Sequence, residues 1–548
     1  MAGGLWKHRP FWFSGEDKDE RMEKMNPESV SVDVPSYPGL GRVLAGDYYE
    51  DLPFETYISD SQPVPSGPDV YDIRDFGAVP GRGILNTKAL QAAADACEKA
   101  GGGTVLVAGG SYCSGTITLH SGTTLFIAPD AEILASRNAD LLIDPNPAMG
   151  TESSGGAFLC IQDASDVTVT GGGRISGNGE WYTYEPRKAP LFAPCDTVML
   201  PRRDQAGQIN TVPGSIRTAY RDRIRYAEDK YGEGKPHLRR PSYMVWAQNC
   251  RNLVFDNIIL HDSMCWTLNV DCCDGVVIRN LVIDDNRHVA NTDGIDLTGS
   301  SNVEISRCFV SCADDGLCLK NPVSTGRSMS HIRIRDCVVV SVMNAFKIGT
   351  GTRYDISDVC VENCIFTMPD LYPGSVSGIS IESCDGSKVS NVTLRNLVMS
   401  NVTCPVYILL NRRNEAGDPY TEEVGANAYW GGGIRGIRIE NIAASDVELP
   451  CIITGYADRK KDGSPVRQAV SDIAIANAVL KYREAGEKVT VPDPVPEFLT
   501  DYPESNAHGD VPACGFYVRH ADRVSLENIL VAPRKANTRE TIVMEDVR

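Results

Sequence analysis

The 548-residue sequence lacks several features that mark common protein classes. It has no apolar run of the roughly 18 residues that a membrane-spanning helix requires. Basic residues are scarce, because 53 Lys and Arg stand against 72 Asp and Glu and give a formal net charge of −19. This charge argues against nucleic acid or an anionic membrane as a partner. It also argues against electrostatic capture of a long polyanion, unless a local basic patch overrides it.

The start of the chain lacks the apolar segment of a secretory signal. Lys7, His8 and Arg9 are basic, but no hydrophobic region follows them,. For the chain as given we expect a cytoplasmic location, or a periplasmic or secreted one if a signal was removed. The sequence leaves the oligomeric state open.

The 18 cysteines lack the paired C-x-x-C spacing of a zinc site, and we expect neither a metal nor a cofactor,. Many of them lie within short apolar phrases. We therefore expect reduced, buried thiols and a reducing compartment. Disulfides between successive repeats are the alternative.

A short phrase of alternating apolar residues recurs at intervals of roughly 25 residues, which is typical of a coil that stacks on itself. It begins with Asn or Asp, or with Gly or His, in the segments Asn252-Leu-Val-Phe, Gly275-Val-Val-Ile, Asn302-Val-Glu-Ile, His331-Ile-Arg-Ile and Asp358-Val-Cys-Val. Alternating side chains indicate half-buried strands. The sequence thus predicts an all-β fold of stacked parallel strands.

Three carboxylates, Asp293, Asp314 and Asp315, lie beside glycines and just before apolar alternations. Asp293 and Asp315 are 22 residues apart, close to one repeat. Equivalent positions on stacked strands lie roughly 4.8 Å apart, so we expect these side chains to be neighbours. Glycine would let a ligand approach the backbone there. A protonated acid beside an ionised carboxylate can hydrolyse a glycosidic bond.

Asn-Thr-Asp at 291–293 followed by Asp-Asp at 314–315 resembles the family 28 glycoside hydrolases, the polygalacturonase-like enzymes. The resemblance covers about residues 70–548. It implies a single-stranded right-handed parallel β-helix and inverting hydrolysis of pectin-type α-glycosides. It implies Asp314 as the general acid and Asp293 with Asp315 as the base that activates water. A gap of roughly 6.5–9.5 Å between acid and base carboxyls is then expected.

The rest of the chain divides into an arm, a capped coil and an insertion. We expect residues 1–66 to be an N-terminal arm that packs on the body, and 67–548 to be the parallel β-helix. A helix after Asn86 or Thr87, ended by Gly101-Gly102-Gly103, would cap the coil,. The insertion 179–241, with a helix after Ser215, would lie beside the binding groove. Its basic face is either a solvated surface or a wall that holds a sugar carboxylate.

Two motifs that grip a galacturonate carboxylate in the family have no counterpart here. Asn344 stands in place of the histidine of Gly-His-Gly, and Lys347 is near enough in sequence to supply the missing cation. Ser380 and Glu382 replace the cations of Arg-Ile-Lys, and Glu382 would repel a uronate. The substrate is therefore a galacturonide held differently, a rhamnogalacturonan fragment or a neutral side chain.

The other expected substrate-binding residues surround the acid cluster. Asn291 belongs to the Asn-Thr-Asp motif, and Lys320 follows the acid pair on the same strand, where it could hold a sugar group or pair with an aspartate. His288 precedes the motif, and Arg240 belongs to the Arg-Arg-Pro phrase before the next strand. We expect hydrolysis of a pectin-derived oligosaccharide, with exo action. A lyase on the same fold, or a non-catalytic glycan-binding β-helix, is the alternative.

Overall fold

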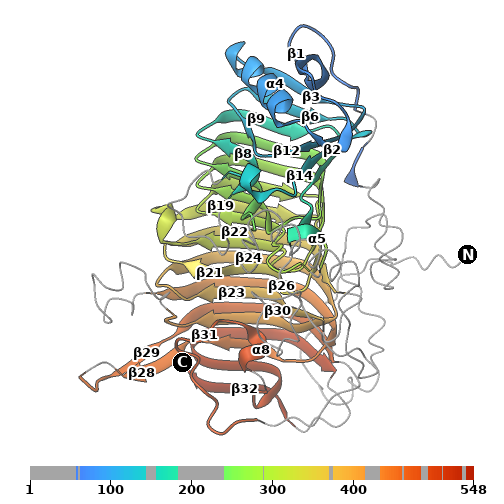
Figure 1. The fold of residues 1–548 in the computed structure, drawn as a ribbon. Helices are drawn as coiled ribbons and strands as arrows, with labels where there is room; N and C mark the ends of the chain where they lie inside the picture. Colours follow the sequence, from blue (N-terminus) through green and yellow to red (C-terminus); the bar gives the residue numbers. More distant parts are fainter. Residues whose placement is uncertain are drawn as a thin grey trace, which may run out of the picture.

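The computed structural model describes residues 57–59, 62–143, 156–182, 240–287, 289–368, 374–413, 432–459, 462–482, 491–508, 510–532 and 539–548. They form an elongated right-handed parallel β-helix, in which successive coils stack along the long axis (Figure 1). The predicted fold class is thus confirmed. None of the helices in the described part is long and apolar enough to cross a membrane.

The strands stack into parallel ladders. The ladder that carries the acid cluster, called the site ladder below, consists of β5 (Ile117–Leu119), β8 (Ala157–Gln162), β11 (Tyr243–Gln248), β13 (Trp266–Asp271), β15 (Ile295–Thr298), β18 (Leu317–Asn321), β21 (Asn344–Thr352), β23 (Ser375–Ser383), β25 (Val402–Leu410), β27 (Cys451–Thr454), the start of β31 (Ala513–Ala532) and β32 (Glu540–Val547).

Two further ladders complete each coil. The first contains β1 (Val70–Asp72), β3 (Gly103–Val107), β6 (Thr123–Ile127), β9 (Ser165–Thr170), β16 (Ser301–Ser306) and β19 (Met329–Arg335), and the second contains β2 (Gly81–Leu85), β4 (Gly110–Ser114), β7 (Ala131–Ala135), β10 (Arg174–Ser176), β17 (Phe309–Cys312) and β20 (Val338–Ser341). Long strands run through both ladders: β12 (Arg251–His261), β14 (Asp274–Asp284), β22 (Ile356–Thr367), β24 (Lys388–Ser400), β26 (Gly433–Val447), β30 (Val470–Tyr482) and the rest of β31.

The recurring phrase repeats because each copy begins at a corner of the coil. Its first residues have positive φ, for example 55° at Asn252, 72° at Gly275 and 56° at Asn302. Asn and Gly tolerate this left-handed conformation better than other residues do. A second corner bends the long strands, and there Asn477 Nδ2 donates to Asn441 Oδ1 over 2.9 Å. The polar groups of consecutive corners thus satisfy one another.

The alternating apolar residues point into the coil as predicted. Ile295, Leu297, Leu317 and Leu319 are fully buried and belong to one continuous core that runs through the stack. Close packing of this kind holds the strand register, because a slip by one residue would turn the apolar side chains outward. The outward positions next to them are therefore fixed in space.

A helix caps the first coils, as expected from the sequence. It is α4 (Thr87–Lys99), with Asn86 as its N-cap residue, and its buried face includes Leu90, Ala93 and Cys97. It packs against the 3-10 helix η2 (Ile73–Phe76) and the first strands (Figure 1). The helix covers the open end of the sheet, where strand edges would otherwise be exposed.

Only parts of the expected arm and insertion belong to the described residues. Tyr57–Ser59 pack on the body, since Ser59 N donates to Asn257 Oδ1 over 2.6 Å and the rings of Tyr57 and Phe309 lie 5.7 Å apart. Within the insertion, α5 (Gly179–Tyr182) is described, whereas the helix expected after Ser215 lies outside the described residues. The boundaries 1–66, 67–548 and 179–241 stay predictions.

Residues 491–508, called the strap below, follow the outside of the coil. The prolines of residues 484–511 predict a linker, but the described part of this segment packs on the coil. Val495 packs with Tyr407 and Tyr517 on the outer face of the site ladder. The strap ends in α8 (Ser505–His508), which contacts β23 and β25. This segment therefore covers part of the surface beside the acid cluster.

The cysteines within the described residues are all free, and most are buried. Cys308, Cys337 and Cys364 lie one coil apart at equivalent positions of the stack, each next to a paired strand residue. Their arrangement fits the expected ladder of interior thiols. The reducing compartment stays a prediction.

Four further elements lie at the coil margins: the 3-10 helices η3 (Ala139–Leu141) and η4 (Val323–Thr325), and the antiparallel strands β28 (Tyr456–Arg459) and β29 (Pro465–Gln468). The pair projects from the stack near its C-terminal end (Figure 1). None of these elements carries an expected site residue.

Candidate active site

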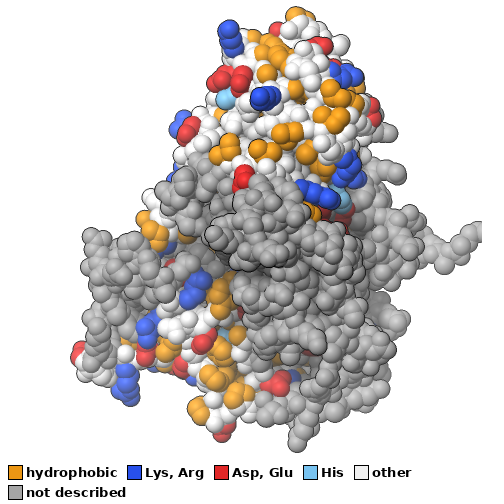
Figure 2. Space-filling model, in the orientation of Figure 1, with side chains coloured by type: hydrophobic (Ala, Val, Ile, Leu, Met, Phe, Trp, Pro, Cys, Tyr) orange, Lys and Arg blue, Asp and Glu red, His pale blue; other side chains and the backbone are white. Residues whose placement is uncertain are grey.

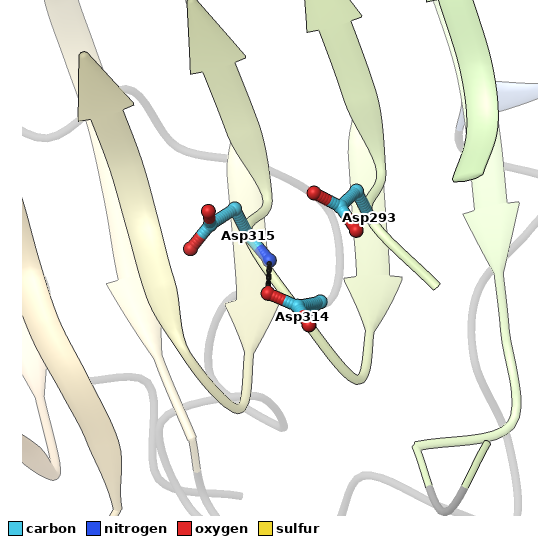
Figure 3. A group of neighbouring side chains, drawn as sticks. All are labelled: Asp293, Asp314 and Asp315. Carbon is cyan, nitrogen blue, oxygen red and sulfur yellow. Dashed lines mark hydrogen bonds between the residues drawn. The ribbon is translucent and has the colours of Figure 1, made fainter. Parts of the chain in front are cut away.

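The three aspartates meet at one edge of the site ladder. Asp293 precedes β15 and Asp314 with Asp315 precede β18, and these strands pair with Ile295 opposite Leu317. Gly294 N donates to Asp315 O over 2.9 Å and sets this register. One carboxylate oxygen of each aspartate lies within 4.8 Å of those of the other two (Figure 3). The neighbourhood expected from the repeat length is present.

The nearest oxygens of these carboxyls are thus closer together than the roughly 6.5–9.5 Å expected between the acid and base carboxyl groups as wholes,. The cause is the ladder itself, because adjacent parallel strands lie roughly 4.8 Å apart and the aspartates occupy adjacent strands. A water molecule activated here would contact more than one carboxylate at once.

The glycines beside the aspartates serve the packing of the coil. A Cβ at Gly294 would lie 2.4 Å from Val310 Cγ1, and one at Gly316 would lie 2.3 Å from Val339 Cγ1. Both distances are too short for real atoms, so only glycine fits. These glycines therefore have a structural role inside the coil, and their expected role in admitting a ligand stays a prediction.

Asp314 is the most exposed of the three side chains. Its Oδ1 accepts a hydrogen bond of 3.0 Å from Asp315 N, and Asn291 Nδ2 lies 3.5 Å from its Oδ2. Ser341 Oγ donates to the Asp314 carbonyl over 2.5 Å and fixes the turn. Asp293 and Asp315 are only 2% and 4% exposed. Asp314 is therefore the carboxyl that a bulky group can reach most easily.

Asp293 is held by Lys320, which forms the first wall of the site together with Asp296 and Trp266. Lys320 Nζ lies 2.9 Å from Asp293 Oδ2 and 2.9 Å from Asp296 Oδ1, and 3.7 Å from the centre of the Trp266 ring. Of the two expected roles of Lys320, the structure shows the ion pair. Asp293 Oδ1 is buried and accepts no hydrogen bond from the described residues.

The electrostatic surroundings of Asp293 act in opposite directions. Burial raises the pKa of Asp293 well above its usual range, while Lys320 lowers it and Asp296 raises it further. Close like charges make such carboxyls titrate together. A carboxylate with a raised pKa is a stronger base once it is ionised.

Asp315 is held by a second wall, which contains Asn344, Lys347, Glu382 and Glu504. Asn344 Nδ2 donates to Asp315 Oδ1 over 2.8 Å, and Lys347 Nζ lies 3.3 Å from Asp315 Oδ2. Lys347 also lies 3.1 Å from Glu504 Oε1 and 3.9 Å from Glu382 Oε1. One ammonium group therefore faces three carboxylates.

Sugar contacts were expected from Asn344, Lys347 and Glu382, but all three side chains are at most 1% exposed. Packing beneath Asp315 puts them out of direct reach, so Asn344 and Lys347 act on a ligand through Asp315. Glu382 Oε1 accepts a 2.6 Å hydrogen bond from Ser380 Oγ on the same strand. Its effect on a sugar is electrostatic.

Burial disfavours the charged form of each group in this second wall. For Lys347, attraction to Asp315, Glu382 and Glu504 outweighs burial and raises its pKa well above the usual value. Burial raises the pKa of Glu382 to about 8, against the pull of Lys347. Burial also raises the pKa of Glu504.

Arg240 positions Asn291 and does not face a ligand. It is 1% exposed, and its guanidinium donates to Asn291 Oδ1 over 2.9 Å and to Ala290 O over 2.8 Å. This differs from the expected sugar contact, because the arginine lies beneath the motif. His288 lies outside the described residues. Asp296 and Glu504 were missed, and Glu504 carried no signal because it lies far along the chain.

Among the described residues, the three aspartates form a group whose oxygen spacing could suit a cation. The ammonium of Lys320 already lies against one of them. On the described part of the face in Figure 2, basic and acidic side chains are interspersed with apolar ones.

The comparisons with known proteins agree with this geometry. The model of the family "Glycosyl hydrolases family 28" matches residues 225–427, which include all three aspartates. This match and the relatives that follow support a family 28 glycoside hydrolase. A probable polygalacturonase of Vitis vinifera is 23% identical over 401 residues, which cover 70% of each chain. A Persea americana polygalacturonase is 23% identical over 68% of this chain and 66% of its own length.

A solved exopolygalacturonase shares the fold of this chain. The hyperthermoactive exopolygalacturonase of Thermotoga maritima matches with a TM-score of 0.59 and 18% identity, over 86% of this chain and 93% of its own. At this identity the likeness establishes the architecture. The family match and the two curated relatives support a polygalacturonase-like glycoside hydrolase.

Proposed function

We propose that the protein hydrolyses an α-glycosidic bond in a pectin-derived oligosaccharide with inversion, using Asp314 as acid and Asp293 with Asp315 as base. The observation that carries this proposal is the meeting of three carboxylate oxygens within 4.8 Å at the edge of the site ladder. The names of the relatives, which are polygalacturonases, support a galacturonide-type substrate.

The two lysines support the division of roles. Lys320 and Lys347 lie 2.9 Å and 3.3 Å from Asp293 and Asp315, and a nearby cation favours the ionised form of a carboxyl,. We place the shared proton on Asp314, because it is the most exposed of the three side chains. It protonates the leaving oxygen of the glycosidic bond.

The same geometry supports a water molecule between Asp293 and Asp315. Asp293 Oδ1 has no hydrogen-bond partner among the described residues, so it can accept one from water. The water oxygen attacks the anomeric carbon as its proton passes to the carboxylate, and the bond to the leaving oxygen breaks as Asp314 donates its proton. One water is consumed and the anomeric configuration is inverted.

Exo action is supported by the strap. From Asp315 toward the C-terminal coils, Glu504, Ser505 and His508 contact β21, β23 and β25 in turn. A groove covered on that side leaves room for few sugars beyond the cleavage point. Release of short products from the chain end is the expected pattern.

Product analysis tests the reaction. The protein is incubated with galacturonan and rhamnogalacturonan oligosaccharides, and proton NMR follows the first anomer formed. Inversion is expected, with short products only. Retention of configuration would reject the water-activating role, and the close spacing of the carboxyls makes this measurement decisive. Products with an unsaturated, ultraviolet-absorbing sugar that vanish with a chelator would instead select a lyase.

A further inference from the structure

The strap brings one carboxylate to the edge of the acid cluster from a distant part of the sequence. Glu504 is 7% exposed, and its Oε1 lies 3.1 Å from Lys347 Nζ. Its Oε2 lies 3.3 Å from Asn344 Nδ2. These are the same two donors that hold Asp315. Glu504 and Asp315 therefore share one set of partners and lie side by side.

The position of Glu504 is fixed by contacts on both sides of it. Ser505 Oγ donates to Val376 O over 3.0 Å and accepts from Ser377 Oγ over 2.9 Å. Tyr407 and His508 are joined by a 3.0 Å hydrogen bond. Earlier in the strap, Glu497 pairs with His520 and Arg519. Glu504 is thus a built part of the site.

One ammonium group faces three carboxyl groups on this side of the cluster. Lys347 is the ammonium that the structure places against Asp315, and it is already shared with Glu382 and Glu504. A sugar carboxylate beside Asp315 would add a further negative charge to this group, and like charges in a desolvated place repel strongly. A hydroxyl could instead donate to these carboxylates, and an ester carries no charge for them to repel.

We propose that Glu504 is a specificity-determining residue: it places a second carboxylate beside Asp315 and so selects an uncharged sugar on the Asp315 side of the bond. The uncharged sugar is either a methyl-esterified uronate or a sugar that has no carboxyl group. This inference rests on the proposed hydrolysis at the same site. It goes beyond that proposal by naming the charge of one bound sugar.

The test compares substrates that differ only in charge. kcat/KM is measured for an oligogalacturonide, for its methyl-esterified form and for its carboxyl-reduced form, with the full-length protein. The wild type is expected to prefer both uncharged forms. Glu504→Gln is expected to raise the ratio of charged to uncharged kcat/KM by about tenfold, because one negative charge is removed while the side-chain shape is kept. The two uncharged forms distinguish an ester from a missing carboxyl.

Glu497→Gln is the matched control. It removes a carboxylate from the same strap without changing the charge beside Lys347, and the substrate ratio should stay within about twofold of the wild type. Glu504→Ala replaces the glutamine variant if thermal unfolding shows that the latter is not folded. A wild type that prefers the charged substrate, or an unchanged ratio in the Glu504 variants, would overturn the inference.

The outcome separates this inference from the proposed reaction. Hydrolysis with an unchanged charge ratio rejects the role of Glu504 and keeps the reaction. Unsaturated products with a changed ratio reject hydrolysis and keep the role of Glu504. If turnover is absent, calorimetric titration is carried out on the Asp314→Asn variant and on the Asp314→Asn, Glu504→Gln double variant. It measures the ratio of the Kd values for the charged and the uncharged oligosaccharides. Absence of binding by all three oligosaccharides rejects both.

Discussion

The two walls of the acid cluster neutralise buried carboxylates in different ways. On one side Lys320, which is partly exposed, neutralises Asp293 and Asp296 and stacks on Trp266. On the other side Lys347, which is fully buried, is shared by Asp315, Glu382 and Glu504. The first wall is built by adjacent coils, whereas the second needs a residue from the strap. Local repetition thus supplies the reacting groups, and a distant segment changes the charge around them.

The largest effect on activity is expected at Asp314. Asp314→Asn should lower kcat by at least about a thousandfold, because the amide keeps the shape of the side chain but has no acidic proton to give. Asp358→Asn is the control, since Asn occupies equivalent corners of the coil at Asn302 and Asn391. Steady-state kinetics and thermal unfolding check both variants. Near wild-type turnover in Asp314→Asn would end the acid assignment.

Removing each lysine compares the two walls directly. Lys347→Met should lower the free energy of unfolding by about 3–5 kcal/mol, because it leaves buried carboxylates without their cation. Lys320→Met should cost less, about 1–3 kcal/mol, since its side chain reaches solvent. Urea unfolding measures both values. Equal losses would show that burial does not distinguish the walls.

The first wall also sets the pH dependence of activity. Lys320 lowers the pKa of Asp293, so Lys320→Met should raise that pKa further. The base is then ionised only at higher pH, and the acidic limb of kcat/KM should move up by about one pH unit. Lys388→Met, on an exposed part of β24, is the control. A limb that stays in place in the Lys320 variant would remove Asp293 from the base role.

The smallest effect is expected at Glu382. Its pKa of about 8 in the folded protein lies above the value of about 4.3 for an unfolded chain,. The stability that this group contributes is complete below the unfolded value and is lost as pH rises through the folded one. Glu382→Gln stays neutral, so it should match the wild type near pH 4 and melt about 2 °C higher at pH 8.

Calorimetry over this pH range compares Glu382→Gln with Glu527→Gln, which changes an exposed glutamate of β31. The difference from the wild type should grow with pH only for Glu382→Gln. A difference in melting temperature that does not change with pH would mean that Glu382 is ionised at every pH tested. The attraction between Lys347 and Glu382 would then outweigh the effect of burial.

The sequence predicted the parts of the molecule that repeat. Alternation at Ile295, Leu297, Leu317 and Leu319 gave the strands, and the interval between Asp293 and Asp315 placed two carboxyls on adjacent coils. Both inferences use backbone geometry that every coil shares, so a local pattern suffices. The capping helix after Asn86 followed from similar local signals.

The sequence did not predict contacts made across many coils. Glu504 meets Lys347 at a separation of 157 residues, and no periodicity links these two positions. Arg240 was expected to face a sugar, but its place beneath Asn291 depends on how the coils close around it. The carboxyl spacing was expected from a general rule and is set here by the strand ladder.

The strap has a consequence for biosynthesis. A ribosome delivers the coils with the three aspartates long before residue 504 emerges, and coils of a stacked protein can form in sequence as they appear. The nascent chain therefore passes through an interval in which Lys347 and Asn344 lack the carboxylate that later lies against them. During that interval the surroundings of Asp315 differ by one carboxyl group from those in the finished protein.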